Sequence, residues 1–125
     1  MKKILIVDDE PALVELLETE LTVAGYEVVC ASDGLEGLAK AIQERPHLII
    51  LDVAMPKMDG YEALRKLRSS AGTKATPVIL LTAKNETNSI MEAQRLGATD
   101  YLIKPIEPEE LLTMLRRYLA PNPSK

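Results

Sequence analysis

The sequence predicts an α/β domain in which a parallel sheet is covered by helices on both faces. Five short apolar runs, rich in Ile, Val and Leu, are mostly continuous rather than alternating, which is typical of strands buried on both faces. Each run is followed by a segment in which apolar residues recur at helical spacing. Strand and helix thus alternate five times, and right-handed crossovers make the sheet doubly wound, in three layers. With 125 residues, the chain suffices for one hydrophobic core and is too short for two.

The predicted strands are short segments dominated by β-branched and leucine side chains. They cover residues 4–7, 28–30, 48–51, 78–81 and 101–103. After each strand, apolar residues recur three or four positions apart, the spacing of one helix face. The five stripes consist of Leu13, Leu16, Leu17 and Leu21; Leu35, Leu38, Ala41 and Ile42; Leu64 and Leu67; Ile90, Ala93 and Leu96; and Leu111, Leu112, Leu115, Tyr118 and Leu119. The fourth stripe is thin, so the fourth helix is expected to be the least anchored element.

Proline and glycine residues support these boundaries. Pro11 follows an acidic pair and Pro108 precedes the fifth stripe, and both positions suit the first turn of a helix. Gly25 and Gly97 follow the first and fourth stripes, where helices often end in a left-handed conformation. Pro46 is expected to close the second helix.

Composition excludes several classes of protein. The net charge of −4 argues against direct nucleic-acid binding by the chain. No apolar run approaches the ~20 residues that span a membrane, so no membrane contact is expected. The single cysteine, Cys30, rules out an internal disulfide, indicates a cytoplasmic protein and is expected in the core. The single histidine, His47, is expected at the surface. Residues 1–120 are predicted to form the domain, and 121–125 a loose tail or the start of a linker.

Polar side chains follow four of the predicted strands. They are Asp8 and Asp9 after the first, Asp52 after the third, Thr82 after the fourth and Lys104 after the fifth. Ligands of open α/β sheets bind outside the carboxyl ends of the strands, so these side chains are expected to meet at one edge. Three adjacent carboxylates repel one another unless one is protonated or a hard cation lies among them. Carboxylate oxygens, with a phosphoryl group to complete the set, suit Mg²⁺.

The remaining groups at this edge suit phosphoryl chemistry. Lys104 would neutralise a phosphoryl group and Thr82 would donate a hydrogen bond to it. A carboxylate can itself accept phosphorus. Asp52 is the candidate nucleophile because it follows a buried run and lies deepest, whereas Asp8 and Asp9 are paired as cation ligands.

Five short motifs occur in order along the chain. They are Ile6-Val7-Asp8-Asp9-Glu10, Leu51-Asp52-Val53-Ala54-Met55-Pro56-Lys57-Met58-Asp59-Gly60, Leu81-Thr82-Ala83, Gly97-Ala98-Thr99-Asp100-Tyr101 and Lys104-Pro105. Each motif is weak alone, but together and at these spacings they form a specific pattern. From about Lys3 to Leu119, the chain resembles the receiver domain of two-component response regulators, including the chemotaxis regulators.

The resemblance implies a role for each residue at the phosphoryl site. Asp52 would accept a phosphoryl group from a histidine kinase or a histidine phosphotransfer protein. Lys104 would pair with that group and Thr82 would hydrogen-bond it. Tyr101 would pack inward in response, so that Thr82 and Tyr101 together form the switch.

The resemblance also implies the metal ligands and the order of the strands. Asp9 and Asp52 would bind Mg²⁺ directly, Asp8 mainly through water, and the backbone carbonyl of Ala54 would be a further ligand. The implied fold is flavodoxin-like, with strand order 2-1-3-4-5. The Lys104–Pro105 bond is expected to be cis, as is usual in that family.

The sequence therefore predicts a phosphorylation-dependent switch rather than an enzyme with an external substrate. Its output surface would be the face formed by the fourth helix, fifth strand and fifth helix. Candidate contacts there are Ile90, Met91, Met114 and Arg117. The chain is expected to act as a monomer or as a phosphorylation-dependent dimer. Two alternatives remain open: a degenerate receiver that binds proteins without phosphorylation, and a phosphatase with an aspartyl nucleophile.

Overall fold

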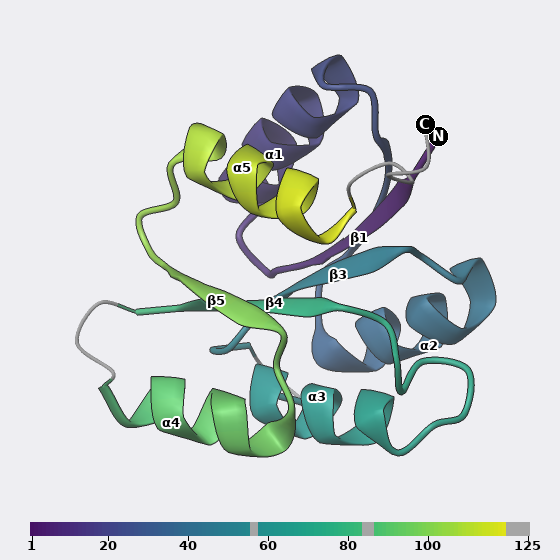
Figure 1. Ribbon diagram of the computed structural model, residues 1–125, viewed down its shortest axis with the longest axis vertical. Coiled ribbons are helices and arrows are strands. Elements are labelled where there is room, and N and C mark those ends of the chain that lie inside the picture. Colours follow the sequence, from purple (N-terminus) through teal and green to yellow (C-terminus); the bar gives the residue numbers. More distant parts are fainter. Residues whose placement is uncertain (56–57, 84–86, 120–125) are drawn as a thin grey trace.

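Figure 1 shows the computed structural model, which describes residues 1–55, 58–83 and 87–119, with the backbone alone for 87–90. Residues 56 and 57 of the second motif and the predicted tail, 121–125, lie outside the described residues. The five strands form one parallel sheet in the order β2-β1-β3-β4-β5, which confirms the predicted order. The strands are β1 (Lys3–Val7), β2 (Glu27–Ala31), β3 (Leu48–Asp52), β4 (Val78–Thr82) and β5 (Asp100–Ile103).

Five helices cover the two faces of the sheet. They are α1 (Pro11–Val23), α2 (Gly34–Glu44), α3 (Gly60–Arg68), α4 (Thr87–Leu96) and α5 (Pro108–Tyr118). Figure 1 shows α1 and α5 on one face and α2, α3 and α4 on the other. The three-layer α/β prediction is therefore confirmed. Within the described ranges, no helix combines the length and apolar composition needed to cross a bilayer.

The apolar interior consists of two clusters, one on each side of the sheet. Successive strand residues alternate between them: Leu5 packs toward α2 and α3, whereas Ile4 packs toward α1 and α5. The same alternation holds along β3 and β4. The prediction of strands buried on both faces is therefore confirmed, because each continuous apolar run supplies side chains to both faces of a parallel sheet.

Helices α2 and α3 begin with the same four-residue pattern, Asp-Gly-x-Glu. Asp33 precedes α2 and its carboxylate accepts a hydrogen bond from the Glu36 backbone N–H at 2.8 Å. Asp59 precedes α3 and accepts from the Glu62 backbone N–H at 2.9 Å. Each aspartate satisfies a backbone donor that the first turn leaves without an intrahelical partner. The two helices thus start in the same way, near the carboxyl edge of the sheet.

The ends of three helices agree with the predicted boundaries, although one of them carries a left-handed residue that is not glycine. Gly25 and Gly97 have φ angles of 100° and 95°, as expected for left-handed helix ends. After α2, however, the left-handed residue is Arg45, with φ 50°. Pro46 disfavours a right-handed helical conformation at the residue before it, so α2 ends at Glu44.

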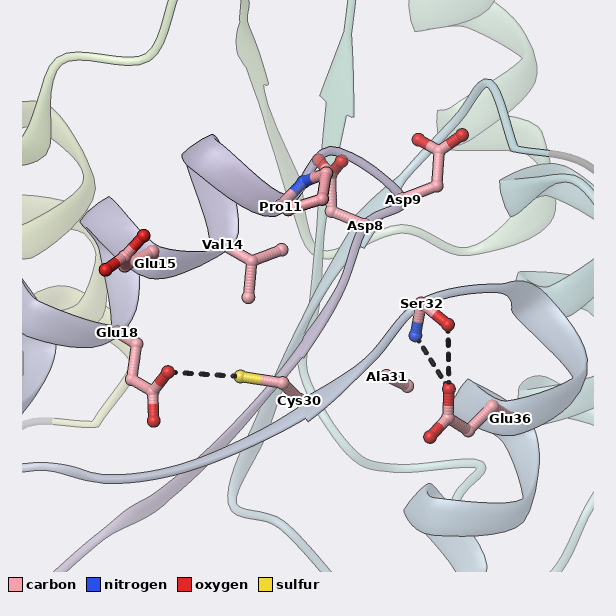
Figure 2. Close-up of a pocket in the computed structure, with 10 residues that line it drawn as sticks. All are labelled: Asp8, Asp9, Pro11, Val14, Glu15, Glu18, Cys30, Ala31, Ser32 and Glu36. Atoms are coloured by element: carbon pink, nitrogen blue, oxygen red, sulfur yellow. Dashed lines mark hydrogen bonds between the residues drawn. The ribbon is translucent and has the colours of Figure 1, made fainter.

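His47 was predicted at the surface and Cys30 in the core. His47 is exposed, as predicted, and its Nδ1 accepts a hydrogen bond from the Lys3 backbone N–H at 2.9 Å. Cys30 is half-buried rather than fully in the core. Figure 2 shows its sulfur pointing toward Glu18, with 3.9 Å between Cys30 Sγ and Glu18 Oε1, in a cavity of about 380 Å³ between α1 and the end of β2.

Candidate functional site

The polar residues predicted at the strand ends meet at the carboxyl edge of the sheet. Asp52 is the last residue of β3 and Asp8 directly follows β1. Their side chains are buried, with residue exposures of 4% and 1%. Lys104, which follows β5, places its Nζ 3.2 Å from Asp52 Oδ1 and 3.4 Å from Asp8 Oδ2. One ammonium group therefore bridges two buried carboxylates.

The backbone positions Lys104 for this contact. Its N–H donates to the Thr82 carbonyl at 2.8 Å, which ties the end of β5 to the end of β4. The Lys104–Pro105 peptide bond is cis, as predicted. Lys104 Nζ also lies 3.6 Å from Glu10 Oε1. Glu10, which directly follows the Asp8-Asp9 pair, is not among the predicted site residues.

Burial controls the protonation of this cluster. Loss of solvation raises the pKa of Asp52 to about 6; the Asp8 charge adds to this effect and Lys104 opposes it. Burial likewise raises the pKa of Asp8. For Lys104, burial alone would lower the pKa, but the Asp52 and Asp8 charges outweigh it and raise the pKa above its ordinary value. The lysine is therefore charged at neutral pH.

The three carboxylates fit a hard divalent cation. Carboxylate oxygens of Asp8, Asp9 and Asp52 all lie within 4.8 Å of one another. Asp8 Oδ2 is buried, and the Lys104 ammonium lies 3.4 Å from it. Mg²⁺ prefers oxygen ligands and is usually bound by a small number of carboxylates together with water, so this cluster suits it. Asp9 is exposed, which leaves one side of the cluster open to solvent.

A cavity of about 250 Å³ lies beside the carboxylates. Its walls are Asp9, Glu10, Asp52, Val53, Ala54, Leu81, Ala83 and Lys104. Ala54, whose carbonyl is predicted as a metal ligand, is exposed and lines this cavity. The space is large enough for a phosphoryl-sized group together with water.

The two predicted switch residues lie at different depths. Thr82 is buried at the end of β4, and its Oγ1 has no hydrogen-bond partner among the described residues. Tyr101, in β5, is partly buried against the cluster beneath α3 and α4. The structure therefore brings Asp8, Asp9, Asp52 and Lys104 into one cluster at the carboxyl edge of the sheet. Tyr101 packs instead against the apolar side chains beneath α3 and α4.

A model of the response regulator receiver domain matches residues 4–116. The chain belongs to this family. Among solved structures, the chemotaxis response regulator CheY4 of Vibrio cholerae is similar with a TM-score of 0.88 and 42% identity, over 94% of this chain and 98% of that one. The receiver domain of the sensor histidine kinase PA1611 from Pseudomonas aeruginosa also matches, with a TM-score of 0.88 and 32% identity, over 96% and 98% of the two chains.

The comparison extends to the metal and to the kind of activity. The PA1611 receiver domain is described with a magnesium ion coordinated in its active-site cleft. Receiver domains bind Mg²⁺ in their acidic site, and this chain has the corresponding aspartate cluster. Receiver domains are signalling domains of two-component systems rather than enzymes in the usual sense.

Curated relatives correct one prediction. The DNA-binding dual master transcriptional regulator RpaA of Synechocystis is 42% identical over 95% of this chain and 49% of its own length. The chain spans about half the length of the curated relatives it matches. The prediction of no direct nucleic-acid contact is therefore wrong for this kind of protein, because its relatives include a DNA-binding transcriptional regulator. It rested on the net charge of 125 residues, which carries no information about the remaining half of such relatives.

Replacing Asp52 tests the electrostatic cost of the cluster. The pKa of Asp52 is raised from 3.8 to about 6 in the folded chain, so ionisation of Asp52 destabilises the fold above pH 6, and this penalty disappears as the pH falls below about 4. Without metal at pH 7.5, we expect Asp52→Asn to raise the free energy of unfolding by about 2 kcal/mol. Urea denaturation from pH 4 to 8 measures this. Curves for wild type and variant that stay parallel over the whole range would contradict it.

Replacing Asp9 tests the cation site. Bound Mg²⁺ at a hundredfold excess over its Kd stabilises a fold by about 2.7 kcal/mol. We expect Asp9→Ala to abolish the rise in Tm on adding Mg²⁺ without lowering the Tm of the metal-free protein, because the Asp9 charge repels Asp8 and Asp52. Glu62→Gln, an exposed carboxylate on α3, is the matched control and should keep the full response. An intact Mg²⁺ response in Asp9→Ala would show that the site is wrongly assigned.

Proposed function

We propose that this receiver domain is a phosphorylation-dependent switch in which Asp52 accepts a phosphoryl group from a histidine kinase or histidine phosphotransfer protein. The observation that carries the proposal is the Lys104 ammonium, 3.2 Å from Asp52 Oδ1, next to a cluster of three carboxylates and an open cavity. The corresponding domain extends over residues 1–120. A cytoplasmic location is consistent with the single, half-buried cysteine.

Asp52 performs the nucleophilic step. A carboxylate oxygen of Asp52 forms a bond to phosphorus while the phosphorus–nitrogen bond of the donor phosphohistidine breaks, and the imidazole leaves with the bonding electron pair. With a pKa of about 6, Asp52 is mostly ionised at neutral pH and can act as this nucleophile. The chain thus catalyses only a reaction of its own side chain.

The surrounding side chains stabilise the charge that develops on the phosphoryl group. Lys104 already contacts the attacking carboxylate and can move its donors onto the phosphoryl oxygens. Asp9, Asp52, Asp8 and the Ala54 carbonyl would hold Mg²⁺, which neutralises phosphoryl oxygens when bound. Their charges, together with Lys104, keep the donor group oriented toward Asp52.

Thr82 links the reaction to a change of shape. Its buried Oγ1 lacks a partner in the described residues, so a hydrogen bond to a new phosphoryl oxygen satisfies it. Movement of Thr82 toward that oxygen would open space above β4, into which Tyr101 can pack. The strands that carry these two residues, β4 and β5, both contact α4, so the surface formed by α4, β5 and α5 is the proposed output face.

The described part of α4 is only lightly held. Of its side chains from 91 to 96, only Ala93 is buried in the core, and Met91 is 70% exposed. On α5, Arg117 Nη1 lies 3.6 Å from Asp100 Oδ2, while Met114 is partly buried. The side chain of Ile90 lies outside the described residues. An exposed methionine beside charged pairs suits a protein partner with a partly apolar contact.

Incubation with acetyl phosphate and Mg²⁺, followed by intact mass measurement, tests the phosphorylation. We expect one phosphoryl adduct on the wild-type chain and none on Asp52→Asn. Asp59→Asn, which changes a carboxylate that caps α3, is the matched control and should keep the adduct. A wild-type chain without an adduct would support the protein-binding scaffold instead, and rapid turnover of the donor would support a phosphatase.

Amide hydrogen exchange tests the output face. On phosphorylation we expect the exchange rates of backbone amides in α4, β5 and α5 to change, because α4 has few buried side chains and contacts the strands that carry both switch residues. Asp52→Asn treated with the same donor serves as the control. Changes restricted to α1 and α2 would place the output surface elsewhere and contradict the assignment.

A further inference from the structure

The two Asp-Gly-x-Glu turns do more than start two helices. Neither glycine has a positive φ angle; among the described glycines, that conformation occurs at Gly25 and Gly97. Backbone conformation therefore gives no reason for glycine at positions 34 and 60. The reason is instead steric, because in both turns another part of the backbone occupies the place of a side chain.

Gly60 lies directly against the backbone of the proposed nucleophile. A Cβ atom on Gly60 would lie 2.3 Å from the Asp52 carbonyl oxygen and 2.8 Å from Val53 Cα, well inside any contact that side chains tolerate. The Gly60 N–H also donates to the Val53 carbonyl at 2.8 Å. The first turn of α3 therefore holds the backbone of Asp52 and Val53 in place.

Gly34 makes a similar close contact, but with Met58 rather than with Asp52 or Val53. A Cβ atom on Gly34 would lie 2.3 Å from the Met58 carbonyl oxygen and 2.9 Å from Met58 Cβ. Met58 is buried and lies two residues before Gly60. The start of α2 therefore supports the segment that in turn supports Asp52.

The start of α2 is itself held firmly. The Glu36 carboxylate accepts hydrogen bonds from the Ser32 backbone N–H at 2.8 Å and from Ser32 Oγ at 3.1 Å, as Figure 2 shows. Together with the Asp33 cap, these bonds tie the first turn of α2 to Ser32, the residue before the cap. A Cβ atom on Gly34 would therefore displace Met58 more easily than it would displace α2.

We propose that Gly34 is a positioning residue for the phosphorylation of Asp52, acting through the backbone contacts Gly34–Met58 and Gly60–Asp52. The inference rests on the proposed function of Asp52. Gly34 touches neither the phosphoryl group nor the cation; it sets where the segment after β3 lies. A small displacement of a reacting group, on the order of 1 Å, is enough to lower a rate about 100-fold.

Gly34→Ala tests the proposal. At saturating Mg²⁺ and acetyl phosphate, we expect the rate constant for adduct formation on Asp52 to fall about 10- to 100-fold, while the far-ultraviolet circular dichroism spectrum stays unchanged. Met58→Gly is a second variant that alters the same contact from the loop side, because it removes the Cβ atom that packs against Gly34, and its rate should fall as well. This variant keeps the test decisive if Gly34→Ala fails to fold.

Two controls separate positioning from loss of stability. Gly72→Ala adds a methyl group where no atom lies within 4 Å, and it should keep the wild-type rate. Ala41→Gly destabilises α2 from its buried face, away from the Met58 contact, and should also keep the wild-type rate at temperatures where it is folded.

The outcomes distinguish this inference from the proposed function. A wild-type rate in folded Gly34→Ala, or an equal loss of rate in Ala41→Gly, overturns the inference and leaves the role of Asp52 intact. Absence of any adduct on the wild-type chain overturns the proposed function, and the inference with it. A slower rate in Gly34→Ala and Met58→Gly, but in neither control, supports it.

Discussion

The bridge from Lys104 to Asp52 and Asp8 is the interaction on which the carboxyl edge of this domain depends. Two carboxylates buried to this degree repel each other and lose solvation, and a single ammonium group in contact with both offsets part of that cost. The compensation is incomplete, because Asp9 adds a third negative charge nearby. The site thus keeps an excess of negative charge that suits a cation, and in the proposed function the lysine exchanges these contacts for a phosphoryl group.

The fold could be read from the sequence because its strongest signals are local. Continuous apolar runs identify buried parallel strands, and glycine and proline mark the ends of helices; both depend on a few neighbouring residues. The order of the strands came from the resemblance to a family, since no spacing in the chain specifies which strands are adjacent. The continuous runs also indicated burial on both faces, but a run such as residues 48–51 does not reveal which side chain faces which helix layer.

The site was predictable in its composition but less so in its contacts. Aspartate, threonine and lysine at strand ends point to one edge of a sheet, and the structure places them there. The proximity of Glu10 to Lys104 and the close contacts of Gly34 and Gly60 were not foreseen. Such contacts depend on how loops return to the sheet, and glycine in a sequence does not indicate whether it serves a turn or a close approach. The charge of the chain, in turn, misled the prediction about nucleic acid because it describes this domain alone.

The sheet separates the apolar interior into two clusters that share no side chains, since alternate residues of each strand face opposite helix layers. Substitutions in distant, non-contacting positions usually have additive effects on stability. Changes beneath α1 and α5 should therefore show little epistasis with changes beneath α2, α3 and α4. Natural selection can thus remodel one helix layer for a new partner while the packing of the other layer is retained.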